Sequence, residues 1–407
     1  MDLLKVDTIQ EARNKLEACC DVLMPKAEDV DITAASGRVL AFDIISKEDI
    51  PPYRRSIMDG YAVQSKDLGA AGDMIPTVLK ITGEVVMGTD CTDLTVNAGC
   101  CVYVPTGGYV PEGADAVVMV EYCETFGDGM LAVSRSASPG ENVVQVGEDI
   151  SEGSILLHRG RKLMPQDIGT LAASGIVSVP VYIPWKVTVI STGDELVNPG
   201  ETPGPGQIRD INSYTISARS ASEGFTIVRT ISLADDMEEI AAALETAKAD
   251  SDLVIISGGS SQGKKDLTAE LIGSASDHGV LTHGIAAKPG KPTITGFDEK
   301  SKTLLIGLPG HPAAAIMVYE QLLINLWRNL IGLRSQRSVK AKIDSNVPSA
   351  AGRMTFQPVK LRGNEAEAIF AKSGMISPLS VSDGYFMMTE NQEGVRAGDT
   401  VDVFLWE

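Results

Sequence analysis

Three loops in the sequence combine small, hydroxyl-bearing and charged residues in a way that suits anion chemistry. They are residues 191–196 (STGDEL), 257–266 (SGGSSQGKKD) and 307–312 (GLPGHP). The second loop holds three glycines, three serines and two lysines just before an expected helix. Its backbone amides and the helix N-terminus can hold a phosphate or a similar oxyanion. A flexible turn without a ligand is the alternative interpretation, because glycine also serves tight turns.

Lysines and carboxylates gather around the same loops. Residues 288–292 (KPGKP) place two lysines on a proline-stiffened turn, which can present charge to an anion at little entropic cost. Carboxylates that could bind magnesium (Mg²⁺) through oxygen, and so bridge to a phosphate, are Asp194, Glu195, Asp235, Asp236 and Asp266. A solvated basic turn and helix-capping acids are the alternatives.

The composition argues against several other kinds of site. Six cysteines without a C-x-x-C pair suit neither a disulfide framework nor a zinc knuckle, and four scattered histidines lack metal-ligand spacing. A net charge of −19 without a basic stripe argues against a nucleic-acid partner. The apolar runs are too short to cross a bilayer, and residues 1–20 are charged rather than signal-like. We therefore expect a cytoplasmic protein without a membrane partner.

The loops belong to a stretch, residues 185–333, in which apolar strands alternate with helical segments. Strands are expected at 187–190, 227–231, 253–256 and 304–306, and helices at 214–223, 237–248, 267–276 and 313–330. This alternation predicts a doubly wound, mostly parallel α/β sheet with helices on both faces. The loops should then open at the carboxyl edge of the sheet, where such folds bind their ligands.

The rest of the chain is expected to form smaller parts around this α/β domain, giving a multidomain α/β plus β protein. A capping box at Thr8 and Glu11 opens a helix, which we expect to pack with a second helical stretch over 166–174. The predicted domains are a discontinuous, helix-containing linker domain of residues 1–28 and 150–184, an inserted β domain of 29–149, the α/β domain of 185–333, and a C-terminal β-barrel-like domain of 334–407.

The order and composition of these segments resemble the molybdopterin molybdenumtransferase family, which includes MoeA and the E domain of gephyrin. The matching segments span nearly the whole chain: 51–53 (PPY), 56–63 (SIMDGYAV), 105–107 (PTG), 113–118 (GADAVV), 147–150 (GEDI), 191–196, 257–261, 288–292 and 308–310 (LPG). The resemblance implies an elongated homodimer, with a cleft between the α/β domain of one subunit and the β domain of the other. It also implies a transferase that binds adenylylated molybdopterin, inserts molybdate, and releases AMP and molybdenum cofactor.

Carried over position by position, the resemblance marks acids at Asp59, Asp149, Glu195, Asp266 and Asp235 or Asp236, and a hydroxyl at Thr106. The magnesium and phosphate roles given below are expected from the chemistry of the side chains. The expected catalytic acids are Asp59, Asp149, Glu195 and Asp266. The expected magnesium ligands are Asp266 with Asp236 or Glu195. The expected substrate or phosphate contacts are Thr106, Gly258, Gly259, Ser260, Ser261, Lys288, Lys291 and Pro309. Two choices stay open, between Asp235 and Asp236 as the acid that faces the cleft, and between Arg353 and Arg362 as the C-terminal arginine that reaches it.

Some positions depart from the family pattern. Residues 53–55 read YRR where many members carry FDN, residues 258–263 read GGSSQG instead of GGVSVG and are followed by two lysines, and His311 replaces a common asparagine. The roles of Arg54, Arg55 and His311 therefore stay open, as does the choice between molybdate and tungstate.

Two other hypotheses accompany the insertase. A molybdopterin adenylyltransferase would resemble residues 185–333 alone, and the β domains disfavour it. A non-catalytic dimeric scaffold would be expected to lose Asp59 or Asp266, and both are present. A molybdopterin adenylyltransferase and apo-molybdoenzymes are further partners that the resemblance implies.

Overall fold

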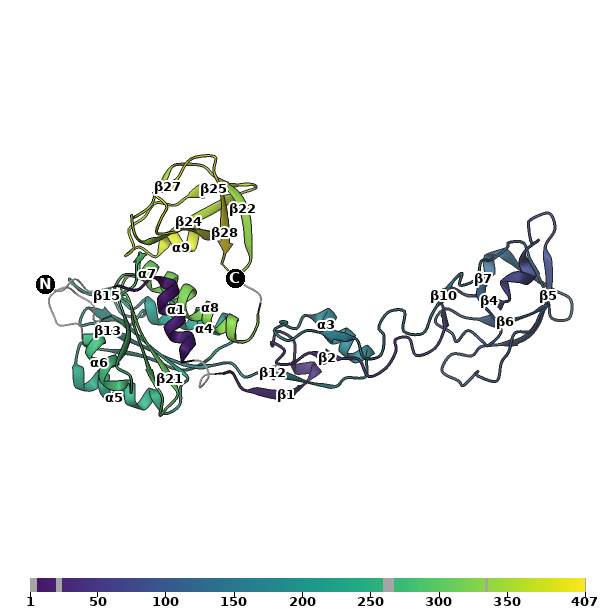
Figure 1. Cartoon of the computed structure of the whole chain (residues 1–407), viewed down its shortest axis with the longest axis horizontal. Helices are drawn as coiled ribbons and strands as arrows, with labels where there is room; N and C mark the ends of the chain where they lie inside the picture. The colour runs from purple at the N-terminus through teal and green to yellow at the C-terminus, as the bar shows by residue number, and fades with distance from the viewer. Residues whose placement is uncertain (1–5, 20–23, 259–266, 334–335, 407) are drawn as a thin grey trace.

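The computed structural model describes residues 6–19, 24–258, 267–333 and 336–406. The chain is elongated, with the α/β domain and the C-terminal strands at one end and a β domain at the other, joined by a narrow middle region (Figure 1). No helix within the described residues is both long enough and apolar enough to cross a membrane.

A six-stranded sheet forms the centre of the α/β domain, in the order β16-β13-β17-β21-β20-β18. Its strands are β13 (Lys186–Thr192), β16 (Thr226–Leu233), β17 (Leu253–Gly258), β18 (Val280–His283), β20 (Ile294–Asp298) and β21 (Thr303–Leu308). The first four strands in the order pair in parallel, so the predicted parallel core of the sheet is confirmed. β20 instead pairs antiparallel with both of its neighbours.

The sequence does not predict the antiparallel edge of the sheet, because residues 280–298, which form β18 and β20, have no clear strand pattern. β20 contains Gly296, which lies against the helix of residues 267–275. A Cβ at Gly296 would be 2.5 Å from Ile272 Cγ2 of this helix and 2.4 Å from Oγ of Ser276, which directly follows it. The close approach of this helix requires a glycine, which also weakens the apolar run by which a strand is identified.

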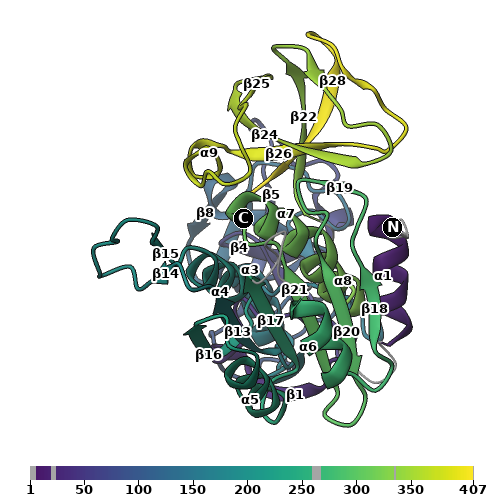
Figure 2. The same cartoon turned by 90° about the vertical axis from the view of Figure 1, so that its left-hand side faces the viewer.

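Helices cover both faces of the sheet and bury two separate apolar cores (Figure 2). One core involves α1 (Ile9–Ala18), α4 (Asn212–Ser222), α7 (Pro312–Tyr319) and α8 (Asn325–Leu330), and the other involves α5 (Met237–Lys248) and α6 (Leu267–Ala275). The predicted helix over 313–330 is continuous, but its middle, Glu320–Ile324 (η4), is π-helical. The first core contains an aromatic cluster of Trp185, Phe225 and Trp327.

The opening helix α1 belongs to the α/β domain rather than to the linker. Its capping box forms as expected, with the Glu11 amide donating to Thr8 Oγ1 at 3.1 Å. Its buried residues Ile9, Ala12 and Leu16 join the α/β core, where α1 contacts β18, η4 and α8. The predicted packing of this helix against 166–174 is therefore wrong. An apolar stripe shows that a helix buries one face, but not which distant segment covers it.

The middle of the molecule is a small unit built from two separated segments. β1 (Ala27–Asp31) pairs antiparallel with β12 (Ser178–Tyr182), and β2 (Ile44–Ile45) with β11 (Ile155–Leu157). The helix α3 (Pro165–Ala173) buries Leu171 in the core of this unit, together with Leu40 and Val179. Apart from the position of α1, the four predicted domain bounds stay predictions.

The β domain holds a six-stranded sheet in the order β7-β4-β6-β5-β9-β8. Its strands are β4 (Gly60–Val63), β5 (Thr77–Glu84), β6 (Cys100–Val104), β7 (Ala116–Met119), β8 (Cys123–Phe126) and β9 (Met130–Val133). A short pair, β3 (Arg55–Ser56) and β10 (Val143–Val144), flanks it. Three 3₁₀ turns lie before or within these regions: Ile32–Ala34, Ser65–Leu68 and Val120–Tyr122.

The C-terminal strands close into a small barrel, because β24 pairs with both β25 and β26 while β22 and β28 complete the ring. These strands are β22 (Ser338–Ile343), β24 (Met354–Arg362), β25 (Glu365–Ala368), β26 (Gly384–Met388) and β28 (Thr400–Leu405), with α9 (Ser377–Val381) and the short pair β23 (Val347–Pro348) and β27 (Gly394–Val395). The two-residue strand β19 (Ala287–Lys288) of the α/β domain adds to β24. Figure 2 shows the barrel above the sheet, with β19 at the junction.

Candidate active site

A cleft of about 920 Å³ opens at the carboxyl ends of β13, β17 and β21. Its walls are the loops that follow these strands, the lysine turn, and the edge of the C-terminal barrel. Among the residues expected from the sequence, those that line it are Glu195, Asp235, Gly258, Lys288, Lys291 and Pro309. The structure therefore brings both the candidate anion-binding lysines and two of the candidate acids to one side of the sheet.

Close contacts between the loops fix the shape of the cleft. Gly258 has φ +126°, and a Cβ there would lie 2.0 Å from the backbone oxygen of Thr192. The side-chain amide of Asn212, at the start of α4, donates to Ser257 Oγ at 2.8 Å and to the Gly310 carbonyl at 2.9 Å. The three strand ends are thus held together by one helix terminus and by backbone contact that only glycine allows.

Two polar atoms in the cleft lining are buried without a hydrogen-bond partner among the described residues, namely Thr192 Oγ1 and Asp235 Oδ1. A third such atom, Asn212 Oδ1, lies on the residue that ties the loops together. Buried polar groups nearly always have a partner, because leaving one unpaired costs about 1–3 kcal/mol. The cleft therefore presents acceptor and donor atoms that a polar ligand can satisfy.

Asp235, rather than Asp236, is the acid that lines the cleft. Asp236 is the N-cap of α5, and its carboxylate accepts from the Glu238 and Glu239 amides at 2.9 and 3.0 Å. The expectation that Asp236 serves as a magnesium ligand in the cleft is therefore wrong, because its carboxylate caps α5, and Asp235 is the acid that faces the cleft. Adjacent acids before a helix look alike in a sequence, and the one directly before the first helical residue takes the cap.

The predicted magnesium site lies partly within the described residues. Groups of three or more His, Cys, Asp or Glu side chains suited to a metal are not found within the described ranges. Magnesium commonly takes only one or two protein carboxylates and completes its shell with water and substrate phosphate. Glu195 and Asp235 in the cleft fit that pattern. Gly259, Ser260, Ser261 and Asp266, which the sequence also predicts for this site, lie outside the described residues.

The lysine turn is positioned by contacts on two sides. Gly290 has φ +126°, and a Cβ there would lie 2.5 Å from Val318 Cγ2, so the turn packs closely on α7. On the other side, Lys288 pairs with Thr355 in the β19–β24 ladder. Lys288 and Lys291 are both exposed, and both line the cleft. The turn therefore brings two cations to the cleft on a closely packed backbone.

The barrel contributes the third cation and closes one rim of the cleft. Arg353, just before β24, lines the cleft, whereas Arg362 pairs with Glu367 at 2.8 Å at the far end of the same strand. Arg353 is therefore the C-terminal arginine that reaches this site. His311 Nδ1 lies 2.8 Å from Ser373 Oγ, so this residue links the cap of α7 to the barrel.

The remaining predicted residues, Asp59, Thr106 and Asp149, belong to the β domain or to the segment beside it. This domain lies at the opposite end of the molecule from the α/β domain, which holds the cleft (Figure 1). The Asp59 carboxylate accepts from the Thr106 amide at 2.7 Å and from Thr106 Oγ1 at 3.1 Å, so these two residues form one exposed site. Asp149 is also exposed, and its amide donates to the Ile50 carbonyl at 3.1 Å. A single chain thus carries two separate groups of predicted residues.

The arginines that depart from the family pattern have different surroundings. Arg54 donates to the carbonyls of Ala114 and Pro111 at 2.8 and 3.2 Å, which makes it a support of the β domain. Arg55 is exposed in β3, on the same turn-rich segment as Asp59. Of the two, Arg55 is the one that could face a ligand.

Comparison with known families covers almost the whole chain. Residues 7–175 match the family described as the MoeA N-terminal region (domain I and II). Residues 188–329 match a probable molybdopterin binding domain, and residues 340–406 match the MoeA C-terminal region (domain IV). The three matches follow one another in the order of a MoeA protein.

Individual proteins are similar over the same length. Molybdopterin molybdenumtransferase 2 of Mycobacterium tuberculosis is 33% identical over 96% of this chain and 96% of its own. Molybdopterin molybdenumtransferase of Haemophilus influenzae is 32% identical over 97% of this chain and 98% of its own. The crystal structure of the molybdopterin biosynthesis MoeA protein from Pyrococcus horikoshii OT3 has a TM-score of 0.85 and 31% identity, and the match covers 99% of this chain and 100% of that one.

Proposed function

Because the chain belongs to the MoeA family of molybdopterin molybdenumtransferases, we propose that it inserts molybdate into adenylylated molybdopterin. The products are molybdenum cofactor and AMP. The observation that carries this proposal is the cleft at the carboxyl edge of the sheet, where Lys288, Lys291 and Arg353 lie with Glu195 and Asp235. Such a mixture of cations and carboxylates suits a substrate that carries phosphates and reacts with an oxyanion.

The three cations would bind the negative charges of the substrates. Molybdate and the phosphates of adenylylated molybdopterin are both anionic, so they repel one another unless positive charge lies between them. Lys288 and Lys291 stand on one closely packed turn, and Arg353 stands on the adjoining strand of the barrel. This arrangement holds charge in place before the substrates arrive, which is how preorganised sites stabilise anionic transition states.

Glu195 and Asp235 would hold magnesium at the phosphoanhydride. When bound, this ion would polarise the phosphate oxygens and stabilise the charge that develops as AMP leaves. This role is supported by Asp235 Oδ1, and by Thr192 Oγ1, which also lies in the cleft lining, because neither buried oxygen has a hydrogen-bond partner among the described residues.

Asp59, Thr106 and Asp149 would come from a second copy of the chain. In one chain the β domain lies at the opposite end from the α/β domain, which holds the cleft (Figure 1). In a two-fold homodimer in which the β domain of one subunit met the cleft of the other, the second cleft would be completed in the same way, because such an interface is reciprocal. Because the chain is elongated, its β domain could reach the cleft of a second subunit without rearrangement within either subunit.

The test is a turnover assay with the purified protein, adenylylated molybdopterin, Mg²⁺ and either molybdate or tungstate. AMP release and metal incorporation are followed in the same reaction. The proposal predicts that AMP release and metal incorporation both require the oxyanion and increase together. The oxyanion that gives the higher rate is the preferred substrate. AMP release that does not require the oxyanion, or no release at all, would contradict the proposed insertion reaction.

A further inference from the structure

A second cavity, of about 460 Å³, lies between the α/β domain and the C-terminal barrel, and we call it the junction pocket. One of its walls comes from the lysine turn and α7, and the other comes from β24 and the loop of residues 369–376. Lys288, Pro289 and Ser373 line both the junction pocket and the cleft. The two cavities are therefore neighbours, and one ligand could occupy both.

The lining of the junction pocket is mainly apolar, whereas the cleft gathers charged side chains. Met317 and Phe356 are buried in its walls, and Phe370 and Met375 lie on the loop of residues 369–376. Phe370 and Met375 are 61% and 49% exposed. Large apolar side chains that are exposed together at a pocket are typical of a ligand-binding surface.

The loop of residues 369–376 is hydrogen-bonded to both walls. Gln357 Nε2, on β24, donates to the Ile369 carbonyl at 2.7 Å. The Ala313 amide, on α7, donates to the Ser373 carbonyl at 3.3 Å. The exposed apolar side chains of this loop therefore stand on an anchored backbone.

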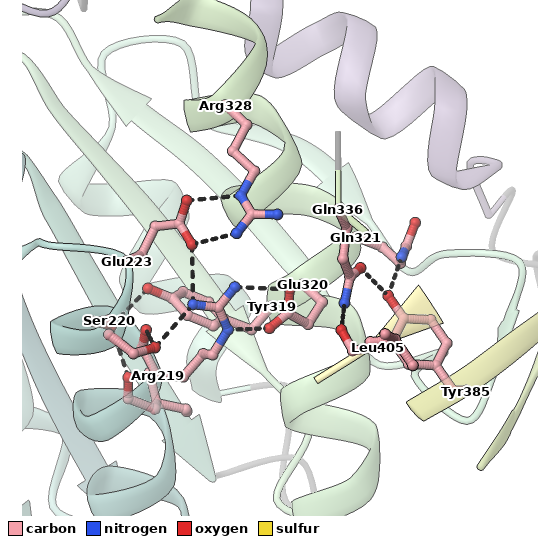
Figure 3. Close-up of polar contacts among 12 residues, drawn as sticks. Arg219, Ser220, Glu223, Tyr319, Glu320, Gln321, Arg328, Gln336, Tyr385 and Leu405 are labelled. Carbon is pink, nitrogen blue, oxygen red and sulfur yellow. Dashed lines mark hydrogen bonds and ion pairs between the residues drawn. The ribbon is translucent and has the colours of Figure 1, made fainter. Parts of the chain in front are cut away.

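A buried polar chain also ties the two domains together behind the pocket (Figure 3). Gln321 of η4 donates to the Tyr385 hydroxyl of β26 at 2.8 Å, and this hydroxyl donates to Gln336 Oε1 at 3.0 Å. The Tyr385 ring packs edge-on against Phe356 of the pocket lining, with the ring centroids 6.2 Å apart. The β19–β24 ladder joins the same two domains. The pocket is thus formed before a ligand binds, which lowers the entropic cost of binding.

The charged groups of the junction pocket are both cations. Lys288 and Lys372 line it and are exposed, and no acidic side chain lines it within the described part of the chain. Neither lysine has an ion-pair partner among the described residues. An apolar pocket with two lysines suits an apolar group that is attached to an anion.

We infer that the junction pocket binds a fused heteroaromatic ring that is joined to a phosphate held in the cleft. Aromatic and methionine side chains pack well on flat rings, and Lys288 lies where the two cavities adjoin. The volume falls within the range of about 300–1,000 Å³ that is usual for small-molecule sites. Adenine and pterin, the two rings of the proposed substrate, both have this chemistry, so the identity of the ligand rests on the proposed function.

Isothermal titration calorimetry of the full-length protein with AMP, hydroxymethylpterin phosphate and ribose phosphate tests the inference. Ribose phosphate carries the anion without the ring. We expect Phe370→Ala to weaken the binding of AMP, of the pterin phosphate or of both about tenfold, the usual effect of removing an aromatic side chain that stacks on a base. The ligand that is affected identifies the ring. The affinity for ribose phosphate should not change, and Phe370→Tyr should retain every affinity within about threefold, because it keeps an aromatic ring.

Phe42→Ala is the matched control, because Phe42 is 62% exposed and does not line the pocket. It should leave all three affinities unchanged. Circular dichroism and thermal unfolding check that each variant keeps its fold. The inference would be overturned by equal losses in Phe42→Ala and Phe370→Ala, by an equal loss for ribose phosphate, or by no effect of Phe370→Ala on either ring-bearing ligand. Failure of the unmutated protein to bind millimolar AMP or pterin phosphate would also overturn it.

This result is distinguishable from the result of the turnover assay. Ring binding that depends on Phe370, together with no AMP release from adenylylated molybdopterin, would support the pocket and contradict the insertion reaction. Oxyanion-dependent AMP release, together with ring binding that is insensitive to Phe370→Ala, would overturn the pocket and leave the insertion reaction supported.

Discussion

The two ends of the molecule hold their predicted site residues in different ways. At the α/β end, the residues follow the ends of buried strands and are fixed by close packing, as Gly258 is against Thr192. At the other end, Asp59 and Thr106 lie on exposed turns and are fixed mainly by hydrogen bonds to each other. The first arrangement can hold a ligand between closely packed loops, whereas the second presents an exposed polar surface, which the proposed dimer would bring to a cleft.

The largest expected effect separates two adjacent acids in the α/β domain. Asp235→Asn removes a cleft carboxylate, and we expect turnover to fall by roughly 100-fold or more, as when an electrostatic contact to the transition state is lost. Asp236→Asn removes the same charge from the neighbouring residue but keeps a good N-cap, so activity should stay within about twofold. Steady-state AMP release compares them. Equal losses would contradict the assignment of Asp235 to the cleft.

Gly258→Ala tests whether close packing sets the shape of the cleft. The new Cβ would meet the Thr192 backbone oxygen, so we expect the free energy of unfolding to fall by about 2 kcal/mol and turnover to fall with it. Gly200→Ala is the control, because a Cβ at that residue meets nothing within 4 Å. Urea unfolding measures both. A Gly258→Ala variant as stable as the control would show that the strand ends are not rigid.

The barrel should contribute to substrate binding through one arginine. Arg353→Ala is expected to raise KM for adenylylated molybdopterin or for molybdate about tenfold, which is the effect of losing one charge-assisted contact. Arg362→Ala, at the far end of β24, removes a surface ion pair with Glu367 of β25 and should leave KM unchanged. Initial rates at varied concentrations of each substrate would show the difference. A matching rise in both variants would argue against a specific role for Arg353.

The smallest expected effect concerns stability in the middle unit. Burial alone would raise the pKa of Asp167, but hydrogen bonds from Arg161 and from the Met164 amide lower it below its usual value. Because the folded pKa is lowered, the stabilisation is present above the unfolded pKa of about 3.9 and is lost as the pH falls through the folded pKa.

Asp167→Asn should therefore destabilise the protein by roughly 1 kcal/mol at pH 7, and by less near pH 3. Thermal unfolding at both pH values measures the difference from the unmutated protein. A difference that grows toward acid pH would show that the carboxylate is not stabilised in the folded state.

The sequence predicts the α/β end of the molecule well because strand and helix periodicity is a local property. The parallel core and the lysine and glycine loops at its carboxyl edge follow from that pattern. The position of α1, the choice of Arg353, and the link between His311 and Ser373 depend on contacts between distant segments. Such contacts leave no periodic signal in the chain. The choice between Asp235 and Asp236 needed the geometry of a helix cap.

Complementation between two inactive variants tests the shared cleft most directly. Asp59→Ala and Asp235→Asn are each expected to be inactive, and they are mixed at equal amounts under conditions that exchange subunits. If each cleft is completed by the partner, half of the dimers are mixed and each mixed dimer has one intact site of two, so activity should return to about one quarter of the unmutated level. No recovery, although mixed dimers are detected by mass spectrometry, would contradict the shared-cleft account.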